Sequence, residues 1–438
     1  MLKLVIWFGV VAVAILAVVY SLLSNRATRA NVSAPMLFLV AGAVFFVFGD
    51  RVAVESAQLH LLAEATLVVV LFHDASTVQL RRLRSDIQLP ARLLGIGFPL
   101  ALIATAVVVA MVFPELPLAA AILVAASITP TDAGLGAATV LNPVVPLRVR
   151  RALNVESGLN DGLATPVVLL ALATLGSSEG ESTLPIFSVT ILPVLLALLI
   201  GVGIAGLAAV SVDASRRVGV SSARTRSIAV LFVPVLCFAV CELASANIFI
   251  AAFVAGLTFG AMSTSDTEEP EVSELLETTA DLLGYVVWFL AGSLIALVVS
   301  TGISWKWVLV AVLALTLLRI VPVGMSLIGS KLAWPSVTFI GWFGPRGLAT
   351  VIFGLLTVEE LGSEQPIVRT IVGVMSMVVV FSVVAHGITA GPLARRYGRW
   401  AEKNAQIETR VDAAEPRSRG HLGSRGSRGA SSEPRNVR

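Results

Sequence analysis

Long apolar runs alternate with short polar connections along most of the chain. A hydrocarbon core about 30 Å thick needs roughly 20 apolar residues per helix, and fewer where a helix is broken. On this criterion the sequence predicts about thirteen membrane-spanning helices, over residues 4–23, 35–50, 58–78, 92–112, 117–139, 153–175, 185–211, 226–243, 246–263, 278–299, 305–329, 335–358 and 366–393. The expected fold class is therefore an all-α polytopic membrane protein.

The two ends of the chain differ from these runs. The first run follows Lys3 and could be a signal peptide, but its apolar stretch exceeds the roughly 7–15 residues of such a segment, which favours an uncleaved helix. After residue 400 the chain is rich in Arg, Gly and Ser, a composition that cannot bury a core. We therefore expect a transmembrane domain over 1–400 and a disordered basic tail over 401–438, which at most contacts anionic membrane lipid.

Basic residues gather in alternate connections, which the positive-inside rule assigns to the cytoplasm. The basic connections lie near residues 26–29, 81–92, 148–151, 216–226, 331 and 395–403. The connections between them are mostly short or acidic, while one assigned to the inside, 263–274, is acidic as well. The protein is expected in the plasma membrane. With an odd number of spans, its N-terminus is expected outside the cell and its C-terminus in the cytoplasm.

Composition supports the same class. The chain is 56% hydrophobic and 13% charged, with a mean hydropathy of +0.90, whereas a soluble domain is about one quarter charged. The net charge of +3 sits in the connections, so it reports topology and not a nucleic-acid partner. Cys237 and Cys241 are interpreted as packing residues. No metal cluster, cofactor site or enzymatic nucleophile is expected, because the histidines are scattered, at His60, His73, His386 and His421.

The stretch NVESGLNDGLATP, residues 154–166, places several polar side chains inside an apolar run. Glu156, Ser157, Asn160 and Asp161 fall on one side of a 3.6-residue helix. A lone Asn or Ser in a membrane is usually an interhelical hydrogen-bonding group. A carboxylate at mid-membrane costs roughly 2.5–3.5 kcal/mol, so Asp161 indicates an ion or proton pathway.

A predicted helix break lies in AASITPTDAGLG, residues 125–136. Pro130 has no N–H and biases Thr129 away from the helical region. Broken backbone at membrane depth lines protein or a watery cavity, and its freed carbonyls can bind a small cation together with Thr131 and Asp132, which follow. A simple proline kink is the alternative, although it leaves Asp132 unexplained.

A second break is predicted in GWFGPRGLAT, residues 341–350. Gly344 and Pro345 weaken the helix and place Arg346 deep in the apolar region. Because arginine stays charged and a buried charge needs a counterion, Glu156 is its predicted partner. One interrupted helix in each half of the chain points to a midplane site between inverted repeats, although the two breaks fall in the fourth and fifth helices of their halves.

Three motifs in this order, TPTDA, ESGLND and GPRG, carry a resemblance over nearly the whole membrane region. The chain resembles sodium/proton exchangers of the monovalent cation:proton antiporter-1 (NhaP-like) family. That resemblance implies thirteen helices, a homodimer, and two unwound helices that cross beside the ion site.

The resemblance also implies roles for individual residues. Asp161 would bind sodium and protons in competition, with the Ser157 side chain and the Thr131 backbone as further Na⁺ ligands and Asp132 nearby. Asn160 would support the aspartate structurally, and Glu156 would pair with Arg346.

The chain departs from the family at LFHDAS, residues 71–76. His73 stands where related proteins often have a glutamate, and Asp74 follows it. Asp74 is an open candidate for an accessory ligand. His73 could tune the pH response, since a free histidine titrates near pH 6.5, or it could be a satisfied surface residue.

These observations predict a secondary transporter that exchanges Na⁺ for H⁺ and serves pH homeostasis, with Li⁺ and K⁺ left open as substrates. A cation and a proton would compete for Asp161, and alternating access would carry either across. One titrating carboxylate favours one-for-one, electroneutral exchange. The alternative is a monovalent cation channel, which would use the same polar residues without proton coupling.

Overall fold

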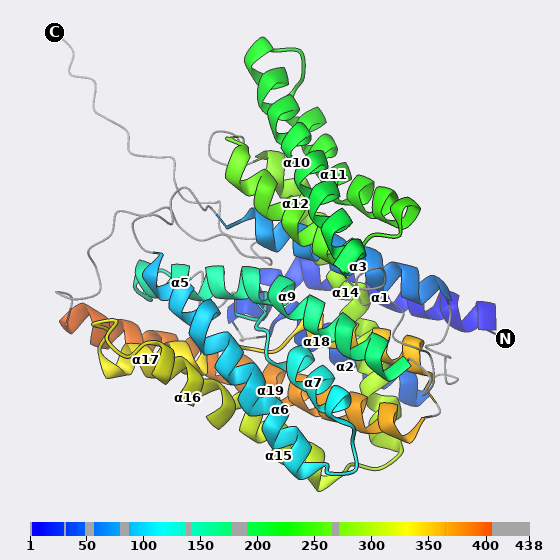
Figure 1. Ribbon diagram of the computed structural model, residues 1–438, viewed down its shortest axis with the longest axis vertical. Coiled ribbons are helices and arrows are strands. Elements are labelled where there is room, and N and C mark those ends of the chain that lie inside the picture. The colour runs from blue at the N-terminus through cyan, green and yellow to red at the C-terminus, as the bar shows by residue number, and fades with distance from the viewer. Residues whose placement is uncertain are drawn as a thin grey trace.

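The computed structural model describes residues 2–29, 32–48, 57–78, 87–132, 134–136, 142–176, 191–264, 271–363 and 365–404. All regular elements in these ranges are helical (Figure 1). In chain order they are α1 (Leu2–Arg29), α2 (Ala34–Phe48), α3 (Ala57–Ser76), α5 (Gln88–Arg92), the π-helical η1 (Leu93–Gly97), α6 (Phe98–Val112), α7 (Leu118–Ile128), α9 (Leu147–Gly176), α10 (Leu192–Val218), α11 (Ala223–Ala244), α12 (Ile248–Met262), α14 (Glu271–Ser300), α15 (Trp305–Leu315), α16 (Leu317–Ser326), α17 (Trp334–Trp342), α18 (Leu348–Leu361) and α19 (Pro366–Lys403).

The predicted spans each coincide with one of these helices or with a run of adjoining ones. Eight of the described helices are long and apolar enough to cross a membrane, and three shorter apolar helices accompany them. The chain is thus a multi-pass membrane protein. α19 runs on to Lys403, past the predicted domain boundary at residue 400. Residues 405–438 lie outside the described ranges, so the disordered tail stays a prediction.

Three of the predicted spans are interrupted in the structure, and two of these interruptions were predicted. The helix of the fifth span ends at Ile128, and the twelfth span is divided between α17 and α18, so both predicted breaks are confirmed. A further interruption, which was not predicted, divides the eleventh span at Thr316 (φ −115°, ψ −93°). Thr316 is neither proline nor glycine, so its residue type gave no signal of an interruption there.

The helices pack into two groups. The scaffold group comprises α1–α3, α10–α12 and α14, and the site group comprises α6, α7, α9 and α15–α19. Figure 1 shows α10–α12 at one end of the molecule and α15–α17 with α19 toward the other. Cys237 and Cys241, both free and buried, lie in the core of the scaffold group, as the packing interpretation expects.

The two groups approach each other closely along α9. A Cβ on Gly158 would lie 3.0 Å from the main-chain oxygen of Asp74 in α3. A Cβ on Gly162 would overlap with the ring of Phe253 in α12. Only glycine allows these approaches, and the two glycines flank Asp161 and its neighbours. The polar face of α9 is therefore next to the contact between the two groups.

Candidate functional site

The polar face predicted for the sixth span lies on α9. Glu156, Ser157, Asn160 and Asp161 are all buried, with at most 8% of each residue exposed. Asp161 lies one helical turn beyond Ser157 on this face, and its main-chain oxygen accepts a hydrogen bond from the Thr165 hydroxyl. A continuous helix thus fixes these polar groups near its middle, inside the protein.

The break after α7 brings Thr131 to this face. The hydroxyl oxygens of Thr131 and Ser157 are 2.8 Å apart, and the Asn160 amide donates to the Thr131 hydroxyl at 2.8 Å. Because Thr131 accepts from Asn160, its own proton is available to Ser157. The structure therefore brings together three of the residues predicted to form the site, with Asp161 beside them.

The oxygen atoms at this site can serve as ligands of a weakly bound alkali cation. The Asn160 carbonyl oxygen is buried and accepts no hydrogen bond from the residues described. Together with the Thr131 and Ser157 hydroxyls and the Asp161 carboxylate, it offers hard oxygen ligands, which such cations prefer. Across the described residues, no three His, Cys, Asp or Glu side chains cluster as a tight metal site would require.

Asp132 joins the two breaks to each other. Its N–H donates to the Pro345 carbonyl at 2.8 Å, and its carboxylate accepts from Leu348 N at 2.8 Å and from Leu135 N at 3.0 Å. Leu348 begins α18, so Asp132 caps that helix and complements its dipole. A Cβ on Gly347 would overlap with the carboxylate, so only glycine leaves room for this cap. The geometry favours a structural role, and ligation by Asp132 stays a prediction.

Glu156 pairs with Arg319 of α16, and the predicted pairing with Arg346 is wrong. Arg319 Nη2 donates to Glu156 Oε2 at 2.8 Å, and Nη1 donates to Oε1, which makes a bidentate ion pair. Both side chains are nearly inaccessible, at 1% for Glu156 and 5% for Arg319. The pair joins α9 to the helix that starts after the interruption at Thr316.

Arg346 instead contacts the main chain of the second break and a hydroxyl of α19. Its Nη1 donates to the Gly344 carbonyl at 2.8 Å, and its own N–H donates to the Ser382 hydroxyl at 2.6 Å. The charges of Glu156 and Asp161 both act on the buried guanidinium of Arg346. Arg346 thus contributes positive charge near the site without pairing with Glu156.

Gly344 allows the second break to approach the first. A Cβ there would lie 2.9 Å from the Thr131 methyl group and 2.6 Å from Arg319 Nε. Both contacts are shorter than real Cβ contacts. The backbone at Gly344 therefore packs directly against the residue whose hydroxyl contacts Ser157.

His73 and Asp74 contact each other in the last turn of α3. His73 Nδ1 is 3.0 Å from Asp74 Oδ1, and the two residues are 4% and 6% exposed. The interpretation of His73 as a surface residue is therefore wrong. The Asp74 main chain meets α9 at Gly158, next to Ser157, so the pair lies at the contact between the two groups. An accessory role for either residue stays a prediction.

Sequence reasoning missed three residues that hold the site together. Arg319 is an arginine inside an apolar run, which is the signal that drew attention to Arg346. Ser382 and His386 in α19 contact the second break. Ser382 carries no signal in sequence, because a serine in a membrane helix is common.

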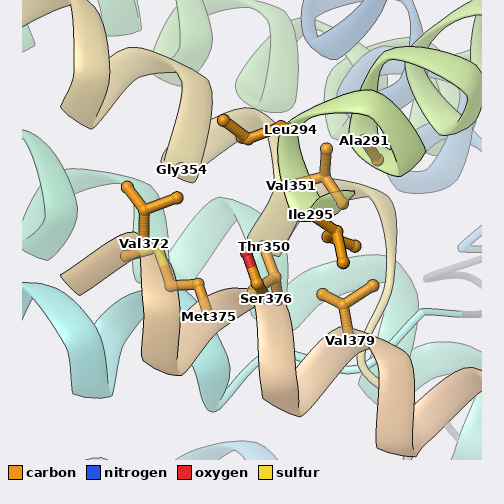
Figure 2. A pocket seen from close by; sticks show the side chains of 10 residues that line it. All are labelled: Ala291, Leu294, Ile295, Thr350, Val351, Gly354, Val372, Met375, Ser376 and Val379. Carbon is orange, nitrogen blue, oxygen red and sulfur yellow. The ribbon is translucent and has the colours of Figure 1, made fainter. Parts of the chain in front are cut away.

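A small apolar pocket lies between α14, α18 and α19. Figure 2 shows aliphatic side chains from all three helices around it, together with the Thr350 and Ser376 side chains. Thr350 donates to the Ser127 carbonyl in the last turn of α7 at 2.8 Å, which ties the pocket wall to the first break. The lining residues include no carboxylate, so the pocket lacks the chemistry of an ion site.

The family model described as "Sodium/hydrogen exchanger, transmembrane" matches residues 12–396. A Na(+)/H(+) antiporter of Schizosaccharomyces pombe is 24% identical over an alignment of 308 residues that covers 63% of this chain and 64% of that protein. Na(+)/H(+) antiporter 2 of Zygosaccharomyces rouxii is 28% identical over an alignment of 270 residues that covers 57% of this chain and 32% of that protein. The match thus spans less than two thirds of either relative.

A solved structure has a similar arrangement of helices. The sodium proton antiporter MjNhaP1 from Methanocaldococcus jannaschii, determined at pH 8, matches with a TM-score of 0.66 and 19% sequence identity. The match covers 90% of this chain and 99% of that one. At this level of identity the likeness establishes a shared fold, and the expected fold class is confirmed.

Proposed function

Since the chain belongs to the sodium/hydrogen exchanger family, whose model matches residues 12–396, we propose that it exchanges a monovalent cation for protons across a membrane. Na⁺ is the cation we propose first, because both yeast relatives are described as Na(+)/H(+) antiporters. Li⁺ and K⁺ are the other candidates. The observation that supports this most directly is the contact of the Thr131 and Ser157 hydroxyls, 2.8 Å apart, on the face of α9 that carries Asp161 one helical turn after Ser157.

Asp161 is the proposed shared site for cation and proton. Ser157, Thr131 and Asn160 would complete the oxygen shell of the cation. Glu156 binds Arg319, and both oxygens of Asp132 accept main-chain hydrogen bonds, so these two carboxylates have structural contacts. Asn160, and not a second aspartate, precedes Asp161 on α9. A single carboxylate at this position supports one-for-one, electroneutral exchange.

Alternating access would move the site group against the scaffold group. The polar face of α9 lies next to the contact between the groups, so a small displacement there would expose Asp161 to a different side. The protonated and the cation-loaded forms both neutralise Asp161, whereas the empty carboxylate is charged and costly to move through a dry contact. This difference would couple the two fluxes.

We further propose a homodimer in the plasma membrane, with the basic end of α19 in the cytoplasm. The clustering of arginine and lysine in alternate connections supports this orientation. Exposed apolar side chains along α10 and α11 would face lipid or a second copy of the chain.

The test uses membrane vesicles that carry a pH-sensitive dye, challenged in turn with Na⁺, Li⁺ and K⁺. We expect cation addition to dissipate an imposed proton gradient, and Asp161→Asn to abolish this response. Glu115→Gln is the matched control, because the Glu115 side chain is 59% exposed and pairs with Lys306 at 3.5 Å, away from α9. Cation flux that persists without any proton movement would instead identify a channel.

A further inference from the structure

The second break opens several helical hydrogen bonds, and α19 contacts both groups of one of them. One of these groups, the Trp342 carbonyl, also accepts from Gly344 N at 2.9 Å. In an unbroken helix the N–H of Arg346 would donate to the carbonyl of Trp342, four residues earlier. Here the Arg346 N–H donates to the Ser382 hydroxyl at 2.6 Å. His386 Nε2 lies 2.9 Å from the Trp342 carbonyl oxygen. A carbonyl only accepts, so Nε2 carries a proton and donates to it.

Ser382 and His386 are one helical turn apart on α19, and both are buried. His386 Nδ1 lies 2.9 Å from the Ser382 main-chain oxygen and 3.3 Å from the Ser382 hydroxyl oxygen. The imidazole is thus held by Ser382 on one side and by the Trp342 carbonyl on the other. Together the two side chains contact both main-chain groups, the Arg346 N–H and the Trp342 carbonyl.

The surroundings of His386 fix the position of its ring. The rings of Trp342 and Phe343 pack against the imidazole, with centroids 5.4 and 6.5 Å away. Arg346, in the second break, and Arg319, in α16, are the charged groups near it. The geometry thus directs Nε2 at the Trp342 carbonyl as a hydrogen-bond donor.

We propose that Ser382 and His386 are positioning residues of the transport site, which act by replacing one of the hydrogen bonds that the second break has lost. The backbone they hold touches the first break at two points. Gly344 packs against the Thr131 methyl group, and the Pro345 carbonyl accepts the Asp132 N–H at 2.8 Å. A shift of residues 343–347 therefore moves Thr131, and with it the hydroxyl that contacts Ser157. The inference rests on the proposed function for its consequence in transport.

The variants separate hydrogen bonding from packing and from titration. Ser382→Ala and His386→Leu each remove one hydrogen bond to the break. His386→Gln keeps an amide donor near the position of Nε2 but cannot titrate. Thr389→Val is the matched control, because Thr389 lies on the same helix and accepts from the Trp342 indole, not from the broken backbone.

The first measurement is hydrogen–deuterium exchange of the peptide that covers residues 342–348, in the full-length protein. We expect Ser382→Ala and His386→Leu to speed exchange there about three- to tenfold, as the loss of one hydrogen bond implies. His386→Gln and Thr389→Val should stay close to wild type. Unchanged exchange in both disruptive variants would overturn the proposal, whether or not the protein transports Na⁺.

The second measurement is the apparent cation KM and the pH profile of exchange in vesicles. We expect Ser382→Ala and His386→Leu to raise KM about three- to tenfold, and His386→Gln to keep both KM and the pH profile. A His386→Gln variant as impaired as His386→Leu, or with a shifted pH profile, would assign His386 to proton chemistry and refute the positioning role. If the wild-type protein does not exchange cations for protons, the proposed function fails. The hydrogen–deuterium measurement still decides whether Ser382 and His386 hold the second break in position.

Discussion

The ion pair of Glu156 and Arg319 makes a quantitative prediction about stability. Both side chains are almost fully buried, and two parallel hydrogen bonds join them. Neutralising one partner, by Glu156→Gln or Arg319→Met, leaves the other charge buried and unpaired, which costs about 3–5 kcal/mol. The double variant removes both charges, so it should be clearly more stable than the sum of the two single losses implies.

The assay is thermal unfolding of the purified protein in detergent. Each double-mutant cycle compares the wild type, the two single variants and the double variant. We expect Glu156→Gln and Arg319→Met to couple at the upper end of the usual range, about 0.5–3 kcal/mol. The matched cycle of Glu156→Gln with Arg346→Met should couple more weakly, because Arg346 donates to Gly344 and not to Glu156. Additive losses in the first cycle, or stronger coupling in the second, would refute the pairing.

Three further predictions concern transport. Asp161→Asn should abolish both cation uptake and proton release at normal expression, and full exchange in that variant would exclude Asp161 as the shared site. In the acid range where Asp161 is mostly protonated, lowering the pH by one unit should raise the apparent cation KM about tenfold, because one proton competes with one cation. If the pH at which the exchange rate falls does not change with the sodium concentration, this competition is contradicted. Gly162→Ala should block exchange, because its methyl group overlaps the Phe253 ring, and adding Phe253→Ala should restore it. Gly203→Ala, which meets no neighbour, is the control, and a double variant as inactive as Gly162→Ala would show that the ring is not the obstacle.

The features that sequence predicted well are the ones with local causes. Pro130 and Pro345 remove N–H donors from their own helices, so both breaks could be placed within a few residues. The shared face of Ser157, Asn160 and Asp161 follows from helical periodicity alone. Each of these needs only neighbouring residues to form.

The partners of the charged groups could not be predicted in this way. Either Arg319 or Arg346 could pair with Glu156 on the basis of sequence. The observed pair depends on packing between residues 163 positions apart. The role of Asp132 depends on its contact with the start of α18, 216 residues away. The sequence places that helix start along the chain but does not show that it lies next to Asp132. The burial of His73 depends on how α3 meets α9, through a glycine that carries no chemical signal of its own.

α19 is much longer than a membrane core is thick. Its 38 residues extend about 57 Å at 1.5 Å per residue, nearly twice the roughly 30 Å of a hydrocarbon core. Its basic end at Lys403 is about 25 Å from His386 along the same helix. Pro392, together with Gly387, Gly391 and Gly398, weakens the helix between these two residues. A force applied to the basic end would therefore reach Ser382 and His386 only in part, because the helix can bend at these positions before it moves them.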